Sequence, residues 1–388
     1  MRSIPFFLFL CYSVLANAAN SWTSVADFGG TARYTAVSFS SGGYGFTGLG
    51  EDASGYKNDM WKYDPVADVW TQVASLPSTG RGGASVFVLS QSAYIVAGKD
   101  SSGPLVENWK YNTVNNVWIA KADLPGSSRS LATGFAVNGD GYVCCGLHGS
   151  QQYLNDAWRY DVVADSWTAI NNFGGSKRAF AVSFVCNNEA YVGTGYDSSN
   201  NYKADFFKYD PIAGQWTSIA PLAGNKRWGA TAFSIQGAGY VCCGFYNNIF
   251  YNDLWEYDVQ NDTWISRTAL SGPTRSHSSA FVINGYAYLF GGANTVFLND
   301  GWKYEPANSS VGVNELTNSL LTIPQVLARG QELRLSDIGN FKLTVFDAKG
   351  NLICRDKNQF TFNESAGIYL LSIRDDKKVV YTGKLLLY

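Results

Sequence analysis

The sequence predicts an all-β protein built around a ring of repeated units, and three observations support this. Glycine is abundant, with 40 residues, and aromatic residues make up 15% of the 388-residue chain, as expected of sheets joined by tight turns. A fixed period near fifty residues is typical of propellers and solenoids. An aromatic residue recurs at steps of 47 to 49 residues, and in the first five copies a Trp follows nine residues later: Trp61/Trp70, Trp109/Trp118, Trp158/Trp167, Phe207/Trp216, Trp255/Trp264 and Trp302 alone.

Each copy of the repeat predicts four short strands. An Arg is followed by an apolar run and a turn, an aromatic residue stands thirteen residues after the Arg, and Gly follows four residues later. A varied polar loop then leads to an acid-x-aromatic-x-Tyr run, as in Asp156–Tyr160, and to a last strand that carries the second Trp. Four strands with turns at close spacing describe one propeller blade.

The N-terminal strand is expected to complete the last blade. Val311 stands where the sixth copy should have its second Trp, whereas Trp22 has no partner in its own copy. Trp22 lies eleven residues before Arg33, the same interval that separates Trp70 from Arg81 in the next copy. This pairing would close the ring and remove an exposed sheet edge. We therefore predict six blades over residues 19–310.

The repeats resemble the kelch family. The resemblance rests on the Gly that ends the second strand, the Tyr of the third and the Trp of the fourth, and it covers about three quarters of the chain. It implies a β-propeller. The double Gly of the family is complete only at Gly291-Gly292, and the other copies replace its first Gly by Leu49, Ala97, Cys145, Thr194 or Cys243.

Residues 1–18 have the pattern of a secretory signal peptide. Arg2 is followed by an apolar run over residues 4–15 and by the small-x-small site Ala16-Asn17-Ala18. Twelve apolar residues are too few to span a bilayer. We expect a secreted or cell-surface protein with no transmembrane segment in the mature chain.

Residues 311–388 leave the period and predict a small C-terminal β-sandwich, with strands over 341–347, 367–374 and 379–387. The Gly367-Ile368-Tyr369 run and Lys384 with the leucines after it resemble the C-terminal sorting domain of type IX (Por) secretion in Bacteroidetes. This resemblance implies the type IX machinery as a partner, passage across the outer membrane and cleavage of the domain. An ordinary immunoglobulin-like appendage is the alternative.

Composition excludes several classes of function. A net charge of −2 gives no basic field for nucleic acid. The chain has only two His residues, His148 and His277. Few side chains are therefore available for a hydrolase site or a metal site, and we expect no metal and no cofactor. Neighbouring strand residues point to opposite faces, so Cys144-Cys145 and Cys242-Cys243 are expected to be buried, inert thiols.

The candidate ligand site lies where the repeats begin and where their loops vary. The first strand of a blade is innermost, so the six Arg residues should lie near one mouth of the central channel, on the face that carries the aromatic loops between the second and third strands. Arg and aromatic side chains suit acidic peptides or sugars. The alternative is an ion pair or backbone brace between blades, because an acid recurs with every Arg. The candidate ligand-binding residues are Arg33, Arg81, Arg129, Arg178, Arg227, Arg275, Tyr153, Tyr196, Tyr202, Tyr246 and Tyr251.

These features favour a binding module for a protein, peptide or glycan ligand over an enzyme. The kelch resemblance also implies a carbohydrate-active enzyme as the alternative, namely a sugar mutarotase or epimerase or, in second place, a galactose-oxidase-like enzyme. A mutarotase would need an acid–base pair near an Arg, for which Glu107 and Glu189 are conceivable. The two His residues occupy different phases of the repeat, which does not match the copper site of galactose oxidase.

Overall fold

The computed structural model describes residues 20–199 and 201–306, together with the backbone of strands between 326 and 387. The chain divides into two compact units, Met1–Ala307 and Asn308–Tyr388. The predicted signal peptide lies outside the described residues.

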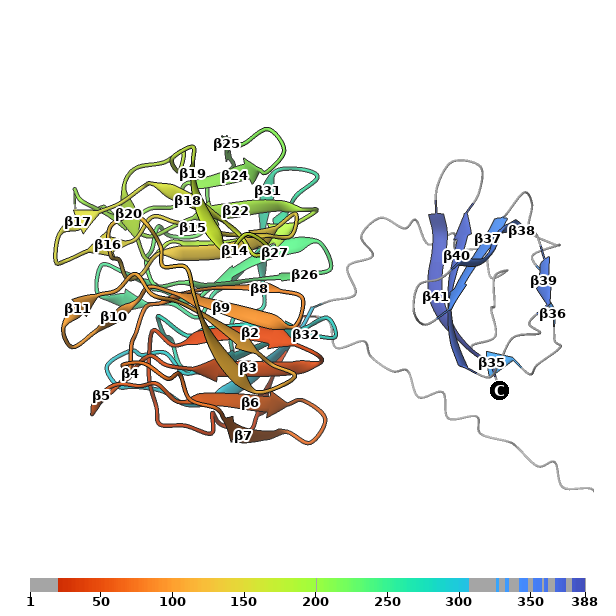
Figure 1. Ribbon diagram of the computed structural model, residues 1–388, viewed down its shortest axis with the longest axis horizontal. Coiled ribbons are helices and arrows are strands. Elements are labelled where there is room, and N and C mark those ends of the chain that lie inside the picture. Colours follow the sequence, from red (N-terminus) through yellow and green to blue (C-terminus); the bar gives the residue numbers. More distant parts are fainter. Residues whose placement is uncertain are drawn as a thin grey trace, which may run out of the picture. The chain divides into compact units, whose positions relative to one another are not determined.

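Unit 1 is a six-bladed β-propeller, as predicted, and each blade is a four-stranded antiparallel sheet (Figure 1). The first strand of every blade begins four residues after the repeated Arg, and in blades I to V the order in the sheet follows the chain. Blades I to V contain β2 (Val37–Ser41), β3 (Tyr44–Gly48), β6 (Met60–Asp64) and β7 (Val69–Val73); β8 (Ser85–Leu89), β9 (Ser92–Val96), β12 (Asn108–Asn112) and β13 (Val117–Lys121); β14 (Thr133–Val137), β15 (Asp140–Cys144), β18 (Ala157–Asp161) and β19 (Ser166–Ile170); β21 (Val182–Cys186), β22 (Glu189–Gly193), β24 (Phe206–Asp210) and β25 (Gln215–Ile219); β26 (Thr231–Ile235), β27 (Ala238–Cys242), β30 (Leu254–Asp258) and β31 (Thr263–Arg267).

Blade VI joins the two ends of the repeat array and confirms the predicted closure. It combines β32 (Ser279–Ile283), β33 (Tyr286–Phe290) and β34 (Gly301–Glu305) with the N-terminal strand β1 (Ser21–Val25). Trp22 pairs in register with Tyr304, and its indole N–H donates to the Thr268 carbonyl of blade V at 3.0 Å. The ring is therefore closed by non-covalent contacts between segments about 280 residues apart.

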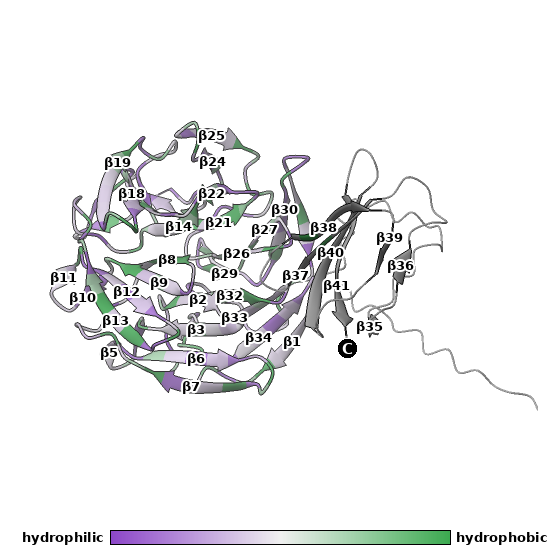
Figure 2. Ribbon diagram, turned by 45° about the vertical axis from the view of Figure 1, so that its right-hand side comes forward, coloured by the Kyte–Doolittle hydropathy of each residue, from purple (hydrophilic) through white to green (hydrophobic). Residues whose placement is uncertain are grey.

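Aromatic layers between the blades form the core. Hydrophobic and hydrophilic residues alternate along the strands (Figure 2), and the inner strands bury every second side chain. In blade III, Phe135 stacks on Tyr142 with ring centroids 5.1 Å apart, and Tyr209 of blade IV contacts both rings. Each buried aromatic side chain contributes about 1.5–3 kcal/mol through burial, so the layers hold neighbouring blades together.

The Trp residues of the last strands also link neighbouring blades. The indole of Trp167 donates to the Ala122 carbonyl at 2.8 Å, and Trp118 and Trp264 make the equivalent bond to the blade before them. The repeated Trp is thus part of the architecture.

Short hairpins extend from one face of the ring, between the second and third strands of the blades (Figure 1). We call this the loop face. Its hairpin strands are β4 (Glu51–Asp52) and β5 (Gly55–Tyr56), β10 (Lys99–Asp100) and β11 (Gly103–Pro104), β16 (Leu147–His148) and β17 (Gln152–Tyr153), β23 (Tyr196–Asp197), which pairs with β20 (Arg178–Ala179), and β28 (Phe245–Tyr246) and β29 (Ile249–Phe250).

The described strands of unit 2 form two sheets. They include the three predicted strands, and whether they form a sorting domain stays a prediction. Among the described residues, no helix is long and apolar enough to cross a membrane. The larger sheet has the order β35 (Val326–Leu327), β41 (Val379–Leu387), β40 (Gly367–Arg374), β37 (Lys342–Asp347) and β38 (Leu352–Lys357), and the smaller one pairs β36 (Glu332–Arg334) with β39 (Gln359–Thr361).

Candidate functional site

The six predicted Arg residues are buried, with at most 2% of each residue exposed. In blade III the Arg129 guanidinium makes a two-pronged ion pair with Asp156, at 2.8 and 2.6 Å. Bidentate pairs of this kind are the stronger form of charge-assisted hydrogen bond. The repeated partners are Arg33–Asp59, Arg81–Glu107, Arg129–Asp156, Arg178–Asp205, Arg227–Asp253 and Arg275–Asp300.

Each Arg also joins two blades through its backbone. The Arg129 N–H donates to the Leu105 carbonyl of blade II at 2.9 Å, and the Arg129 carbonyl accepts from Gly98 N–H at 3.0 Å. Its guanidinium meanwhile donates to the Cys145 carbonyl of its own blade at 3.0 Å. This is the geometry of the brace that the sequence offered as the alternative to ligand contact.

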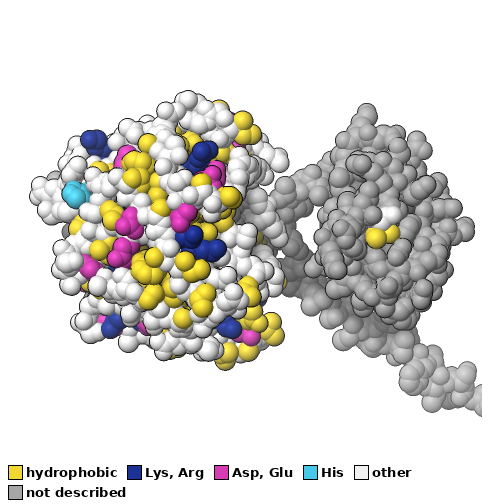
Figure 3. Space-filling model, viewed as in Figure 1, with side chains coloured by type: hydrophobic (Ala, Val, Ile, Leu, Met, Phe, Trp, Pro, Cys, Tyr) yellow, Lys and Arg dark blue, Asp and Glu magenta, His cyan; other side chains and the backbone are white. Residues whose placement is uncertain are grey.

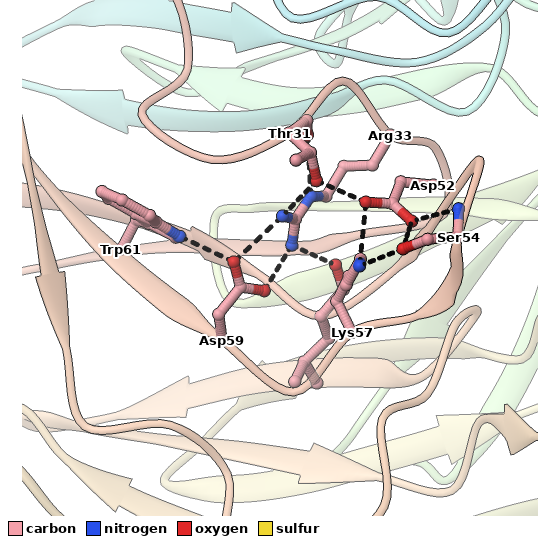
Figure 4. A network of polar contacts seen from close by, with 8 residues as sticks. Thr31, Arg33, Asp52, Ser54, Lys57, Asp59 and Trp61 are labelled. Atoms are coloured by element: carbon pink, nitrogen blue, oxygen red, sulfur yellow. Dashed lines mark hydrogen bonds and ion pairs between the residues drawn. The ribbon is translucent and has the colours of Figure 1, made fainter.

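The network around Arg33 shows how the acid is held (Figure 4). Asp59 accepts hydrogen bonds from the Arg33 guanidinium and from the Trp61 indole, at 2.9 and 2.8 Å. Burial by itself would raise the pKa of Asp59, but these bonds outweigh it and hold the pKa below its ordinary value. The carboxylate therefore stays charged and paired.

The position of the first family Gly has a left-handed backbone in every blade, which explains why Gly suits it. At Leu49, Ala97, Cys145, Thr194 and Cys243 the φ angle lies between 57° and 64°. Cys145 and Cys243 are free and buried, as are the other cysteines whose side chains the structure describes. The predicted burial of the thiols is therefore confirmed for the described cysteines.

A cavity of about 170 Å³ opens at the centre of the propeller. Its wall has two tiers, formed by the residues two and three positions after each Arg. The second tier is more uniform than the first, because it is Ala in five of the six blades. The first tier is Thr35, Gly83, Leu131, Phe180, Gly229 and His277, and the second is Ala36, Ala84, Ala132, Ala181, Ala230 and Ser278.

The first tier is a ring of left-handed residues joined by backbone hydrogen bonds. Its φ angles lie between 52° and 62°. In five of the six junctions, the N–H of one blade donates to the carbonyl of the blade before it, at 2.7 to 3.3 Å. The backbone of this tier is therefore set by the closure of the ring, whatever side chains it carries.

At two positions of this ring, a Cβ would meet a side chain of the next blade. A Cβ on Gly83 would lie 2.7 Å from Leu131, and one on Gly229 would lie 2.6 Å from His277. Leu131 and His277 thus cover the Gly of the preceding blade. Each non-Gly residue in this conformation costs about 1–2 kcal/mol.

His277 is the titratable member of the ring. Its Nδ1 lies 3.0 Å from the Ser276 hydroxyl, and its Nε2 is buried with no hydrogen-bond partner among the described residues. Burial lowers the pKa of His277 to about 4. The imidazole is therefore neutral at pH 7.

Four of the five predicted tyrosines meet in a row on the loop face, which we call the aromatic row. The ring centroids are 6.2 Å apart for Tyr153 and Tyr196, 5.1 Å for Tyr196 and Tyr202, and 5.0 Å for Tyr202 and Tyr246. All four side chains are partly exposed. Tyr251 lies apart from them, over the Arg227 guanidinium at 4.7 Å.

Three residues that the sequence did not single out connect the row to the cavity. The Trp228 ring lies 5.9 Å from Tyr196, 4.1 Å from Phe180 and 5.3 Å from His277. Phe180 and His277 line the cavity. Alignment of the six copies could have found them, because the two positions after each Arg vary while the Arg does not.

The loop face is uncharged near blades V and VI. The loops over residues 245–251 and 293–298 contain no charged residue, although Lys226 Nζ lies over the Tyr246 ring at 5.3 Å. On the face shown in Figure 3, acidic and basic side chains are scattered without a large patch of either sign.

The residues considered for catalysis are engaged elsewhere. Glu107 is paired with Arg81, and Glu189, at the start of β22, pairs with Lys208 at 2.9 Å. Among the described residues, no group of three or more His, Cys, Asp or Glu side chains is placed to hold a metal ion.

Comparison with known proteins agrees with this architecture. The family model of the Attractin/LZTR1 β-propeller matches residues 38–302. The solved structure of YjhT is similar with a TM-score of 0.64 at 14% sequence identity, covering 74% of this chain and 98% of that one. At this identity the likeness shows the fold alone. No curated protein matches the sequence. Because the family match spans more than half of the chain, this protein belongs to the Attractin/LZTR1 β-propeller family and is a kelch-like six-bladed propeller.

Proposed function

We propose that the protein is an exported binding module that holds a glycan on the loop face. The observation that carries the proposal is the aromatic row, in which tyrosines from blades III, IV and V come into ring contact. The repeat does not require Tyr196 or Tyr246, since blades I and II hold Glu51 and Lys99, and Asp52 and Asp100, at the equivalent positions. Tyr153 and Tyr202 share one position of the repeat, which is aromatic in five of the six blades.

The chemistry of the row suits sugars. A pyranose ring has an apolar C–H face that packs on an aromatic ring, and hydroxyl groups at its edge that bond to tyrosine hydroxyls. The blade V loop beside the row, residues 245–251, has no charged residue, and in the blade IV loop Asp197 is paired with Lys203. The buried Arg residues have protein partners, so the ligand contacts of this proposal are those of the tyrosines.

Export is part of the proposal. The pattern of residues 1–18 supports entry into a secretory route, and the type IX resemblance of unit 2 supports passage to the cell surface. Fractionation of the producing cells and mass spectrometry of the mature chain would test both. We expect an N-terminus near Ala19 and loss of the C-terminal unit from the released form; a chain retained intact in the cytoplasm would contradict export.

The binding function is tested on a glycan array with the full chain and with Tyr202→Ala and Tyr246→Ala. We expect the wild type to bind a set of glycans and each variant to bind at least tenfold more weakly. Tyr44→Ala is a matched control, because Tyr44 is 38% exposed and begins β3, at the turn between the first two strands of blade I. Its binding should stay within twofold.

The outcomes separate the alternatives. A silent array with capture of a defined peptide or protein would replace the glycan by a protein ligand. Exchange between anomers of a bound sugar, followed by NMR, would favour an enzyme. Binding that is insensitive to both Tyr substitutions would remove the aromatic row from the site.

A further inference from the structure

The cavity on the propeller axis is built from side chains that the backbone conformation does not favour. Thr35, Leu131, Phe180 and His277 are left-handed, with φ between 52° and 60°. Gly occupies this conformation without strain, as Gly83 and Gly229 do in the same ring. The same conformation recurs at Leu49, Ala97, Cys145, Thr194 and Cys243, so what distinguishes these four residues is that their side chains line the cavity.

The size and charge of the cavity limit what it can hold. Its volume of about 170 Å³ is close to that of cavities of about 150 Å³ that take up one benzene ring. Its twelve lining residues include no Asp, Glu, Lys or Arg, and His277 is neutral at pH 7 because burial lowers its pKa to about 4. A charged guest would therefore be buried without a partner.

The wall also provides hydrogen-bonding groups for a guest with hydroxyls. Thr35 and Ser278 line the cavity. The Ser276 hydroxyl lies 3.0 Å from His277 Nδ1 and 3.4 Å from the Ala293 carbonyl. Nε2 of His277 has no partner among the described residues but is covered by the protein beside Gly229, so the hydroxyl-bearing residues of the wall are Thr35 and Ser278.

A chain of ring contacts through Trp228 links the cavity wall to the aromatic row. Phe180 and His277 form part of that wall, both contact Trp228, and Trp228 contacts Tyr196 of the row. We propose that the cavity takes one uncharged pyranose ring, the terminal residue of a glycan whose next sugars lie on the aromatic row. The protein then recognises the ends of neutral chains, an inference that rests on the proposed glycan-binding function.

The first test compares probes on the full chain. The probes are the methyl glycosides of glucose, galactose and mannose, each with its uronic acid counterpart, as competitors for a glycan that the wild type retains. We expect at least one neutral glycoside to compete, and its uronic acid to compete at least tenfold more weakly. Equal competition by both, or none by any neutral glycoside, would overturn the proposal.

The second test removes cavity side chains with substitutions that tolerate the left-handed backbone conformation. Phe180→Gly and His277→Gly keep a residue that accepts the left-handed conformation, and His277→Asn serves if the Gly variant does not fold, since Asn tolerates this conformation best among the other residues. We expect at least tenfold weaker binding, with thermal midpoints within a few degrees of the wild type. Tyr44→Ala again should bind as the wild type does.

Failure of this inference is distinguishable from failure of the glycan-binding proposal. If binding depends on Tyr202 but not on Phe180 or His277, the glycan lies on the row and the cavity stays outside the site. If no glycan is retained, both proposals fall.

Discussion

At the scale of single residues, the Arg–acid pair shows that a repeated charge can be structural. Arg178 is fully buried, whereas 40% of the Asp205 side chain is exposed. Removing the acid would therefore leave a buried cation without its partner, while removing the cation would leave an acid that water can reach. Removal of the acid should therefore lower the free energy of unfolding more than removal of the Arg.

We predict that Asp205→Ala destabilises the fold by about 3 kcal/mol, more than Arg178→Met does. Urea unfolding of both variants measures the difference. Lys121→Ala is the control, because its ion pair with Asp165 is partly exposed on both sides and such pairs contribute about 0–1 kcal/mol. A larger loss for Arg178→Met than for Asp205→Ala would contradict this account.

His277 predicts a dependence of stability on pH. Its folded pKa of about 4 lies below its unfolded value near 6.5, so the unfolded chain binds the proton more readily between these values. The contribution of His277 is thus fully favourable above about pH 6.5 and falls as the pH drops toward 4, by up to about 3 kcal/mol. Chemical unfolding at pH 7 and pH 5, with His277→Asn alongside, checks this. The variant should lose less stability over that interval, and equal losses would contradict the assignment.

At the scale of secondary-structure elements, the closure of the ring depends on β1. Trp22 is 7% exposed, contacts Tyr304 at 5.0 Å and bonds to blade V. It makes the contacts that Trp167 makes inside blade III, although β1 is joined to blade VI by no short connection. The position of β1 in blade VI therefore depends on its packing and hydrogen bonds.

We expect Trp22→Ala to cost about 3–5 kcal/mol and Trp167→Ala a similar amount. Thermal and urea unfolding of the two variants compare closure with ordinary blade packing. A loss below about 1 kcal/mol for Trp22→Ala, with the full loss for Trp167→Ala, would show that β1 does not hold the ring.

At the scale of the whole molecule, the propeller separates a constant frame from variable surfaces. The Arg braces, Trp bonds and left-handed ring recur in every blade or nearly so, while Trp228, His277, Tyr196 and Tyr246 each belong to one blade. The frame therefore needs no ligand to explain it, and the irregular residues are the ones that define a site. The binding and competition experiments above act on those residues alone.

The sequence by itself determined the blade count, the closure by β1 and four of the tyrosines in the aromatic row, because strand order and phase follow from a hydrophobic and aromatic repeat along the chain. Only the tertiary structure decided that the Arg residues are buried in ion pairs, and that Phe180, Trp228 and His277 meet at a cavity. The Arg–acid pairs join residues 25 to 27 positions apart in one blade. The contacts of Trp228 join residues about fifty positions apart in different blades, and the closed ring imposes the backbone angles. A side chain's burial and its partners depend on the neighbouring blade, and no local pattern in the sequence records where that neighbour places its atoms.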